Sequence, residues 1–464
     1  MIIKVGFSWA KIERATVTEE GFLRDFLGYT VKGRMGASRV ESLYFPKARI
    51  FPAGLANLVV RSARERGYSV EVSYRSLAYE LDANHDLSSL WSHQKDGILT
   101  ALKKERGIIQ HATGTGKGTT ISVLCKILRG KVLVVVTSRQ LLKEMYERIQ
   151  KWAGETPGRV GDGYKELTKR ITVCCVPSLP KLPKSLLESF AAIIGDEVHG
   201  AAANSYWRPL MKCINAGIRL GFSGTPLNRA DKKSLHIVGL FGEIIHKYTP
   251  EQAANDKVTA KATLRLVKCR IPPLLAERHA KDGNYVEWDK VALANNRVRN
   301  LKIGELLRSP SIPYPKILFV RTMHHQDVLK GQYGFSETAK VRYVNHKTPI
   351  DEIAKIKEGL ENGTVEILIS GPIFRQGVDM KRIATVINAA GGKATVDVIQ
   401  KVGRGARRLQ DDGTEKEDFL MIDFDDQGCG CDGQDHRSCE WLERHSRLRR
   451  AAYEKFGYKP MDFQ

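Results

Sequence analysis

The chain has 464 residues, of which 42% are hydrophobic and 27% charged, which is the composition of a globular protein large enough for two or three domains. Its 74 basic and 52 acidic residues leave a net charge of +22, and this excess favours a polyanionic partner such as nucleic acid over a role in solubility alone. The chain shows no apolar run near the roughly 18 residues of a membrane span, no secretory signal and no disulfide framework, so we expect no membrane partner and a cytoplasmic location.

The first 86 residues predict a small α+β domain. IKVGFSWAKIERATV (residues 3–17) alternates like a strand, and AGLANLVVRSARERGY (residues 53–68) has helical spacing. Between them, an extended segment would place Phe45, Lys47, Arg49 and Phe51 on one face, where Lys47 and Arg49 are candidate DNA contacts. The alternative is that Phe45 and Phe51 belong to the core of a small sheet.

Residues 87–250 alternate short β-branched runs with helical stretches, which predicts a mainly parallel sheet. GIIQHATGTGKGTT (residues 107–120) has the layout of a strand, a glycine turn and a helix that binds phosphate through backbone N–H groups, with Lys117 as the cation. His111 stands where such a loop usually begins with glycine, and Gly118 stands where a hydroxyl usually holds Mg²⁺. We expect Thr119 to supply that hydroxyl; the alternative is an ordinary strand–helix turn.

Two adjacent carboxylates end the apolar strand AAIIGDEVHG (residues 191–200). Asp196 at a strand end can hold Mg²⁺, and Glu197 can orient and deprotonate an attacking water. The alternative is that the Asp-Glu pair lies on a solvated surface. The position of the pair at the end of a buried strand, after a phosphate loop, favours nucleotide hydrolysis instead.

The rest of the chain predicts a polar connector (residues 251–305), a second α/β domain (306–425) and a C-terminal Cys-rich loop with a charged helix (426–464). In VIQKVGRGARR (residues 398–408), Arg404 and Arg407 share one helix face and suit the charge that builds up in phosphoryl transfer, or else a nucleic-acid phosphate or solvent. Three thiols and an imidazole in the tail could form a zinc site, the alternative being a flexible loop with free thiols; these candidate ligands are Cys429, Cys431, His436 and Cys439.

Together these segments resemble the motifs of superfamily 2 helicases over about residues 88–425. The matching segments, which resemble motifs Q, I, Ia, Ib, II, III, IV, V and VI, are LWSHQKDGIL (90–99), ATGTGKGT (112–119), TSRQLL (137–142), VPSL (176–179), DEVH (196–199), SGTP (223–226), ILFVRT (317–322), ISGPIFRQGVD (369–379) and QKVGRGARR (400–408). NNRVRN (295–300) resembles an N-x-x-R-N element at the entry to the second lobe.

The resemblance implies two RecA-like domains that bind ATP with Mg²⁺ through Thr119 and Asp196. It assigns catalysis to Lys117, Asp196, Glu197, Arg404 and Arg407. Contacts to ATP are implied for His93, Gln94, Thr113, Gly114, Thr115, Gly116, Lys117, Gly118, Thr119, Gly377 and Asp379. Coupling of hydrolysis to movement is implied for His199, Ser223, Thr225 and Gln400. Contacts to the DNA backbone are implied for Thr137, Ser138, Arg139 and Arg321.

The N-terminal segment resembles the small domain of UvsW-type phage recombination helicases, which remodel branched DNA. It implies a phage DNA helicase or branch-migration translocase in the host cytoplasm, which acts as a monomer on forked or branched DNA with little sequence specificity. The alternatives are an RNA helicase, the translocating subunit of a restriction system, and a non-hydrolysing nucleic-acid-binding protein, which Gly118 would support.

Overall fold

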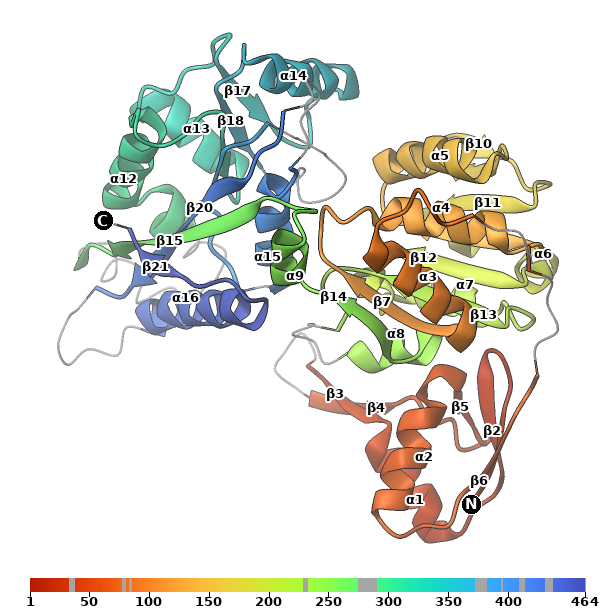
Figure 1. Ribbon diagram of the computed structural model, residues 1–464. Helices are drawn as coiled ribbons and strands as arrows, with labels where there is room; N and C mark the ends of the chain where they lie inside the picture. Colours follow the sequence, from red (N-terminus) through yellow and green to blue (C-terminus); the bar gives the residue numbers. More distant parts are fainter. Residues whose placement is uncertain are drawn as a thin grey trace. The chain divides into compact units, whose positions relative to one another are not determined.

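The computed structural model describes residues 1–32, 38–76, 81–82, 86–227, 233–273, 290–371, 382–393, 395–408, 414–429 and 437–463. Two compact units make up the chain: one contains Met1–Ala112 and Gly116–Tyr248, and the other contains Thr113–Thr115 and Thr249–Gln464 (Figure 1). Each unit holds one large sheet, and the first also carries a small N-terminal sheet. The expected α/β class with two parallel-sheet lobes and a small N-terminal α+β domain is therefore confirmed.

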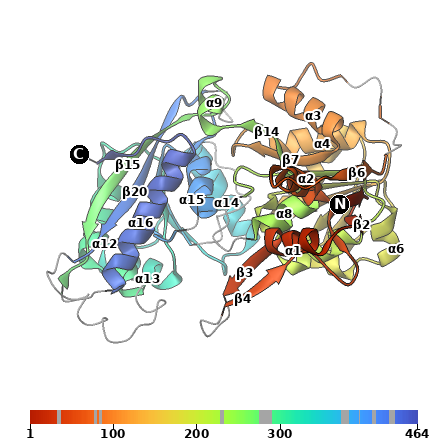
Figure 2. The same cartoon turned by 90° about the horizontal axis from the view of Figure 1, so that it is seen from below.

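The N-terminal domain is a four-stranded mixed sheet in the order β5-β2-β1-β6, accompanied by two helices. The run expected to be one strand is a hairpin, because Gly6 donates its N–H to the Trp9 carbonyl at 2.9 Å and reverses the chain. This domain also contains a separate two-stranded ribbon, which Figure 2 shows as the pair β3 and β4. The elements are β1 (Ile2–Val5), β2 (Trp9–Arg14), α1 (Val17–Phe26), β3 (Gly28–Lys32), β4 (Ser38–Ser42), β5 (Ile50–Pro52), α2 (Ala56–Glu65) and β6 (Glu71–Tyr74).

The segment from Phe45 to Ile50 is a tight turn that leads into β5, so the expectation of one extended face from Phe45 to Phe51 is wrong. Phe45 donates its N–H to the Ile50 carbonyl at 2.8 Å, and Arg49 has a left-handed φ of 52°. Pro46 has no N–H for a sheet ladder and a fixed φ, which suits a turn. Phe51 is fully buried in the core, whereas Phe45 stays partly exposed with its ring edge-to-face on Trp9.

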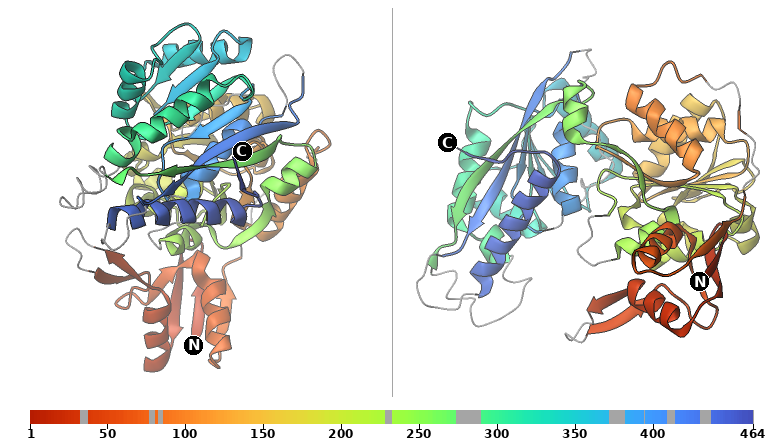
Figure 3. Two further views of the ribbon diagram at one scale, coloured as in Figure 1. Left: turned by 90° about the vertical axis from the view of Figure 1, so that its left-hand side faces the viewer. Right: turned by 60° about the horizontal axis from the view of Figure 1, so that its bottom comes forward.

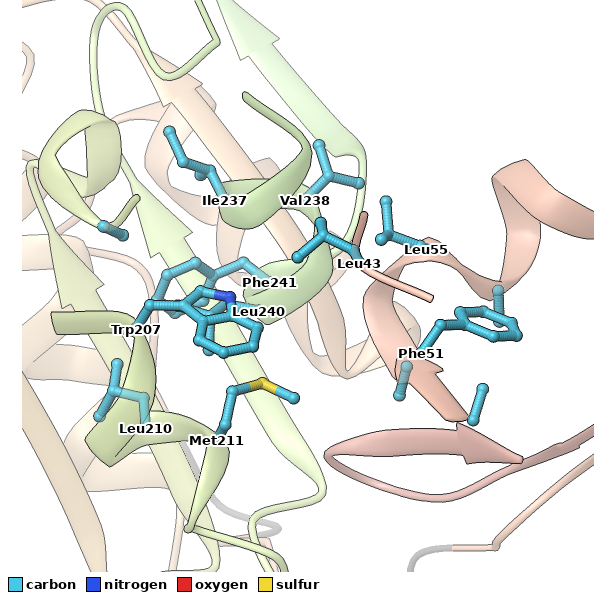
Figure 4. Close-up of a cluster of buried hydrophobic side chains, with 14 of the residues drawn as sticks. Leu43, Phe51, Leu55, Trp207, Leu210, Met211, Ile237, Val238, Leu240 and Phe241 are labelled. Carbon is cyan, nitrogen blue, oxygen red and sulfur yellow. The ribbon is translucent and has the colours of Figure 1, made fainter. Parts of the chain in front are cut away.

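The N-terminal domain packs on the first large sheet through a continuous apolar cluster (Figure 4). Helices α7 (Asn204–Met211) and α8 (Ser234–Phe241) provide one side of it, and Leu43, Phe51 and Leu55 come from the N-terminal domain. The two parts are also joined by a hydrogen bond, in which the buried Arg219 donates to Ser8 Oγ at 2.6 Å. Apolar burial and a buried hydrogen bond therefore join the small domain to this lobe.

The first large sheet has the order β10-β9-β11-β8-β12-β13-β7-β14, and every pairing in it is parallel except β9 with β10. The strands of its centre are uniformly buried, as expected for a parallel sheet covered by helices on both faces. Its elements are α3 (Ser92–Lys104), β7 (Arg106–His111), α4 (Lys117–Ile127), β8 (Val132–Val136), α5 (Arg139–Ala153), β9 (Gly158–Gly161), β10 (Tyr164–Lys165), β11 (Ile171–Cys175), α6 (Lys184–Ser189), β12 (Ala192–Asp196), β13 (Ile218–Phe222) and β14 (Ile244–Tyr248), with α7 and α8.

The second large sheet is parallel throughout, in the order β17-β18-β16-β19-β20-β15-β21. The elements of this unit are α9 (Pro250–Asn255), β15 (Lys261–Arg270), α12 (Arg297–Arg308), β16 (Lys316–Phe319), α13 (Met323–Gln332), β17 (Val341–Val344), α14 (Ile350–Asn362), β18 (Ile367–Ser370), β19 (Thr385–Asn388), α15 (Thr395–Gly405), β20 (Asp418–Gln427), α16 (Arg437–Lys455) and β21 (Met461–Asp462).

The segment expected to be a connector and the expected C-terminal tail both contribute to this second unit. Strand β15 pairs with β20 along its whole length, and β21 pairs with β15 in turn. Helix α16 packs against β20 (Figure 3). Between the two elements, Arg449 contacts Asp423 at 3.0 Å and Asp426 at 2.9 Å. Among the described residues, no helix is both long and apolar enough to cross a membrane.

Candidate active site

The glycine turn between β7 and α4 holds Lys117 in a buried position. Gly114 and Gly116 have positive φ values of 93° and 78°, which side chains other than glycine rarely adopt. Helix α4 begins at Lys117, whose ammonium donates to the carbonyls of His111 at 3.4 Å and Ala112 at 3.3 Å. The loop thus places a cation and the amino end of a helix together, the arrangement that binds phosphate.

His111, which replaces the usual first glycine, has a structural environment. Its side chain is fully buried and its Nε2 lies 2.8 Å from His246 Nδ1, while Gly97 leaves room for the ring. Burial lowers the pKa of His111 to about 2, with smaller contributions from the nearby His246, His93 and Lys117. The imidazole is therefore neutral, and it serves as a packing group at the end of β7.

The Q-motif segment lies beside the glycine turn. Gln94 accepts from Trp91 N–H at 3.1 Å and donates to the Gly116 carbonyl at 3.4 Å. His93, expected near the adenine, is buried and stacks on Tyr248 with ring centroids 4.0 Å apart. Trp91, which the sequence analysis did not select, is 48% exposed, and a Cβ on Gly116 would lie 3.5 Å from its ring. Its position three residues before Gln94 was the available signal.

Strand β12 delivers the two carboxylates to the same edge of the sheet. Asp196 is its last residue, and Glu197 follows with a left-handed φ of 49°. Glu197 Oε1 lies 3.9 Å from Lys117 Nζ. Because β12 and β13 are neighbours, Glu197 Oε2 also accepts from Ser223 Oγ at 3.2 Å and lies 3.3 Å from His199 Nδ1. Segments corresponding to motifs I, II and III thus meet at one carboxylate.

The local charges separate the pKa values of the two carboxyl groups. Burial raises the pKa of Asp196 to about 6, and the neighbouring charge of Glu197 adds to this. Burial also opposes ionisation of Glu197, but the Lys117 charge and the contacts with His199 and Ser223 prevail and lower its pKa to about 2. Glu197 is therefore the anionic member of the pair, able to orient a water molecule.

The donor set fits a hydrated Mg²⁺ ion. Asp196 Oδ1 accepts from the Glu197 N–H at 3.0 Å, and within the described parts of the chain Oδ2 accepts no hydrogen bond. Thr119 is half-buried one position beyond Gly118, whereas the fully buried Thr120 Oγ1 has no partner among the described residues. A carboxylate oxygen and a hydroxyl suit Mg²⁺, which retains several waters.

The residues expected to contact DNA in the first unit lie at the start of α5. Ser138 caps this helix by accepting from the Leu141 N–H at 3.2 Å, and the preceding residue, Thr137, follows the last residue of β8. Arg139 is exposed and lies 3.4 Å from Asp162. Outside this region, Lys47 is exposed and Arg49 pairs with Glu20 at 3.0 Å. Their roles in binding DNA remain predictions.

In the second unit, the structure describes only part of the expected site. Gln400 is buried on α15. Arg407 is half-buried, and its backbone forms an isolated β-bridge with Thr259. Arg321 is half-buried in the segment that follows β16. Gly377, Asp379 and the side chain of Arg404 lie outside the described residues.

In the first unit, Ser223 and Thr225, both expected to couple hydrolysis to movement, contact each other: the Ser223 hydroxyl accepts from the Thr225 N–H at 3.2 Å.

The expected zinc site is only partly described. Cys429 is half-buried and Cys439 is buried, whereas Cys431 and His436 lie outside the described residues. Among the residues that are described, no group of three or more His, Cys, Asp or Glu side chains could hold a metal ion. Zinc binding therefore remains a prediction, which metal analysis of the purified protein would decide.

A parallel sheet with a phosphate loop, a buried lysine and an acidic pair at its carboxyl edge, followed by a second parallel sheet, defines a two-lobed RecA-like ATPase. Residues 79–228 match the family model "Type III restriction enzyme, res subunit", and residues 301–408 match "Helicase conserved C-terminal domain". The chain belongs to the superfamily 2 helicases and translocases, an ATPase family, which confirms the resemblance.

Two relatives agree with this family, and one solved structure agrees with the fold. The "DNA 3'-5' translocase XPB2" of Sulfurisphaera tokodaii is 25% identical, with 70% of this chain and 80% of the relative covered. The "ATP-dependent DNA helicase uvsW" of Enterobacteria phage T4 is 24% identical, with 88% of each covered. The structure of the restriction-modification enzyme LlaBIII bound to DNA has a similar fold, with a TM-score of 0.53, 17% identity and coverage of 83% of this chain and 32% of that one.

Proposed function

We propose that this protein is an ATP-dependent DNA helicase or translocase that unwinds or branch-migrates forked and branched DNA in phage replication, recombination or repair. The observation that carries the proposal is the contact of Glu197 with Lys117, His199 and Ser223, which joins three motifs of a motor. The net charge of +22 supports a polyanionic substrate such as nucleic acid. The names of the relatives, a DNA translocase and a DNA helicase, support DNA.

In the proposed mechanism, Lys117 and the N–H groups of the glycine turn bind the ATP phosphates, and Glu197 orients the attacking water and accepts its proton. Mg²⁺, when bound, neutralises phosphate charge, and Asp196 with the Thr119 hydroxyl would hold it. Ser223 transmits the state of Glu197 to the segment that follows β13, because its hydroxyl contacts both the carboxylate and the Thr225 N–H. Arg404 and Arg407 are proposed to stabilise the transferring phosphoryl group.

Branched DNA suits a motor that contacts mainly the backbone. Opening one step of duplex costs on the order of 1.4 kcal/mol of stacking. Branch migration costs less, because base pairs lost on one arm re-form on another. Backbone contacts also carry little sequence information, so we expect similar activity on sequences of equal shape.

The proposal is tested by ATP hydrolysis and strand separation on a forked duplex, three-way and four-way DNA junctions, and RNA hybrids. We expect turnover that DNA stimulates, and separation of branched DNA in preference to RNA. Lys117→Ala should abolish nucleotide binding, and Glu197→Gln should retain binding but lose hydrolysis by a factor of roughly 100 or more.

Two results would overturn this proposal. Stimulation by RNA but not by branched DNA would indicate an RNA helicase. Hydrolysis unchanged by Glu197→Gln would show that the measured activity comes from a contaminant. It would favour the alternative that the protein binds nucleic acid without hydrolysing nucleotide.

A restriction-type translocase is the second candidate function. It is favoured by the match of residues 79–228 to a restriction-enzyme subunit and by the likeness in fold to LlaBIII. From such a motor we would expect movement along unbranched duplex without strand separation. Displacement of a third strand from linear duplex, with no activity on forks or junctions, would favour this alternative.

A further inference from the structure

Helix α5 places an arginine against the unusual glycine of the phosphate loop. A Cβ atom on Gly118 would lie 2.4 Å from Arg148 Nη1 and 3.0 Å from its Cδ. Arg148 therefore fills the volume that the side chain at position 118 would occupy if it carried the usual hydroxyl. Both residues belong to the first unit, in which α4 and α5 are neighbouring helices.

Among the described residues, the guanidinium of Arg148 has no partner that explains its position. It is half-buried, and it forms no hydrogen bond or ion pair with any residue that the structure describes. A half-buried cation without a carboxylate partner is costly unless a ligand supplies the missing acceptors.

The chemistry at this position suits a phosphate. A guanidinium presents several N–H donors in a plane and matches phosphate oxygens, but it cannot coordinate a metal ion. Arg148 lies next to the second residue of α4, directly beyond Lys117, where the helix N-terminus already favours an anion. The exchange of a hydroxyl for a nearby guanidinium thus replaces a metal ligand with a fixed positive charge.

We propose that Arg148 is a further phosphate-binding residue of the nucleotide site, which occupies the space left by Gly118 and contacts the phosphate oxygens of the bound nucleotide. This inference rests on the proposed nucleotide site at Lys117, Asp196 and Glu197. It has two consequences: part of the phosphate charge is neutralised by the protein itself, and nucleotide affinity depends less on Mg²⁺ than in a loop that carries the hydroxyl.

The test measures the affinity of a fluorescent ADP analogue, with Mg²⁺ and with a chelator, for the full chain. Arg148→Gln keeps much of the packing volume and removes the charge, and we expect its affinity to fall roughly 10- to 100-fold in both conditions. Lys151→Ala, at an exposed position of the same helix, is the control and should bind like the wild type.

A double variant tests the exchange itself. Gly118→Thr alone should weaken binding, because its Cβ conflicts with Arg148. Combining Gly118→Thr with Arg148→Ala removes that conflict and restores a hydroxyl, so we expect the double variant to bind more tightly than Arg148→Ala alone, but only when Mg²⁺ is present. Additive losses in the double variant would overturn the proposed exchange.

The outcomes separate this inference from the site on which it rests. If Lys117→Ala abolishes binding but Arg148→Gln binds as the wild type does, Arg148 contacts no phosphate and only this inference fails. If Lys117→Ala has no effect either, the nucleotide site itself is misplaced. Circular dichroism and the thermal midpoint of each variant identify losses that come from unfolding, and Arg148→Lys, which keeps the charge, should then recover part of the affinity.

Discussion

The hydroxyl of Ser223 connects the acidic pair to the segment that follows β13. It donates to Glu197 at 3.2 Å and accepts the Thr225 N–H at 3.2 Å, with His199 Nδ1 3.3 Å away. Ser223→Ala removes this link but leaves the Lys117–Glu197 contact in place. We therefore expect strand separation to fall roughly tenfold while DNA-stimulated ATP hydrolysis falls less than about threefold, measured as ATP consumed per base pair opened.

The control for this change is Ser189→Ala, whose exposed hydroxyl donates to the carbonyl of Leu186 in its own helix. Equal losses of hydrolysis and strand separation in Ser223→Ala would contradict a coupling role. They would show that the hydroxyl serves only to position Glu197 for catalysis.

Motif order was sufficient to select the residues that meet at Glu197, because the carboxyl ends of neighbouring parallel strands share one edge of a sheet. Trp91 and Arg148 were not selected. Each is brought to the glycine turn by packing between elements distant in sequence. The position of Trp91 three residues before Gln94 was a signal that could have found it, whereas no spacing pattern marks Arg148. The alternation from Phe45 to Phe51 misled for a local reason, since Pro46 favours a turn over a strand.

A buried lysine secures the end of a helix in the second unit. Lys316, the first residue of β16, donates to the carbonyls of Leu306 at 3.1 Å, Leu307 at 2.9 Å and Ser309 at 2.7 Å, at the carboxyl end of α12. Terminal carbonyls have no partner within their own helix, and a cation there is also favoured by the helix dipole.

Lys316→Met keeps the length and removes the donor, so we expect the free energy of unfolding to fall by about 1–3 kcal/mol. Denaturant titration would measure the loss, and hydrogen exchange should localise it to the last turn of α12. Lys355→Met, at an exposed position on α14, should change stability by less than about 0.5 kcal/mol. Equal stability of the two variants would mean that water satisfies the α12 carbonyls.

Strand β15 shows which elements the sequence could not identify. Its residues, KATLRLVKCR, alternate apolar and basic side chains, and the strand it pairs with along its full length, β20, lies far away in the chain. Local pattern cannot reveal such a partner. Likewise, a charged helix such as α16 normally indicates a solvated surface, yet Arg449 is buried between Asp423 and Asp426. Pairing makes this burial tolerable, and pairing depends on the fold.

At the scale of the whole molecule, the repeated alternation of strands and helices was enough to predict two parallel-sheet lobes and a small leading domain. The attachment of that leading domain was not predictable. It depends on shape: Gly54 lies against the backbone of α8, and the buried Arg219 reaches Ser8 across more than two hundred residues of sequence. The first unit is therefore expected to move as one body.

Gly54 tests this attachment, because a Cβ there would lie 2.1 Å from the Val238 carbonyl oxygen and 2.7 Å from that of Gly239. Backbone atoms cannot rotate away, so Gly54→Ala should separate the small domain from α8 and expose the apolar cluster around Leu55. We expect faster proteolysis between the small domain and the first lobe, together with a lower thermal midpoint. Gly21→Ala is the matched control, since a Cβ there meets nothing within 4 Å and alanine favours a helix.

The same two variants test whether attachment of the small domain to the first lobe affects which DNA substrate the protein prefers. If the small domain supplies the proposed contacts to branched DNA, Gly54→Ala should lose the preference for a four-way junction over single strands in stimulating ATP hydrolysis. Hydrolysis stimulated by single strands should stay near the wild-type value. Lys117 and Glu197 follow the carboxyl ends of β7 and β12, whereas Arg219, which contacts Ser8, lies near the start of the neighbouring strand β13 at the opposite edge of the sheet. An unchanged preference in a variant shown to be detached would assign junction recognition to the two lobes instead.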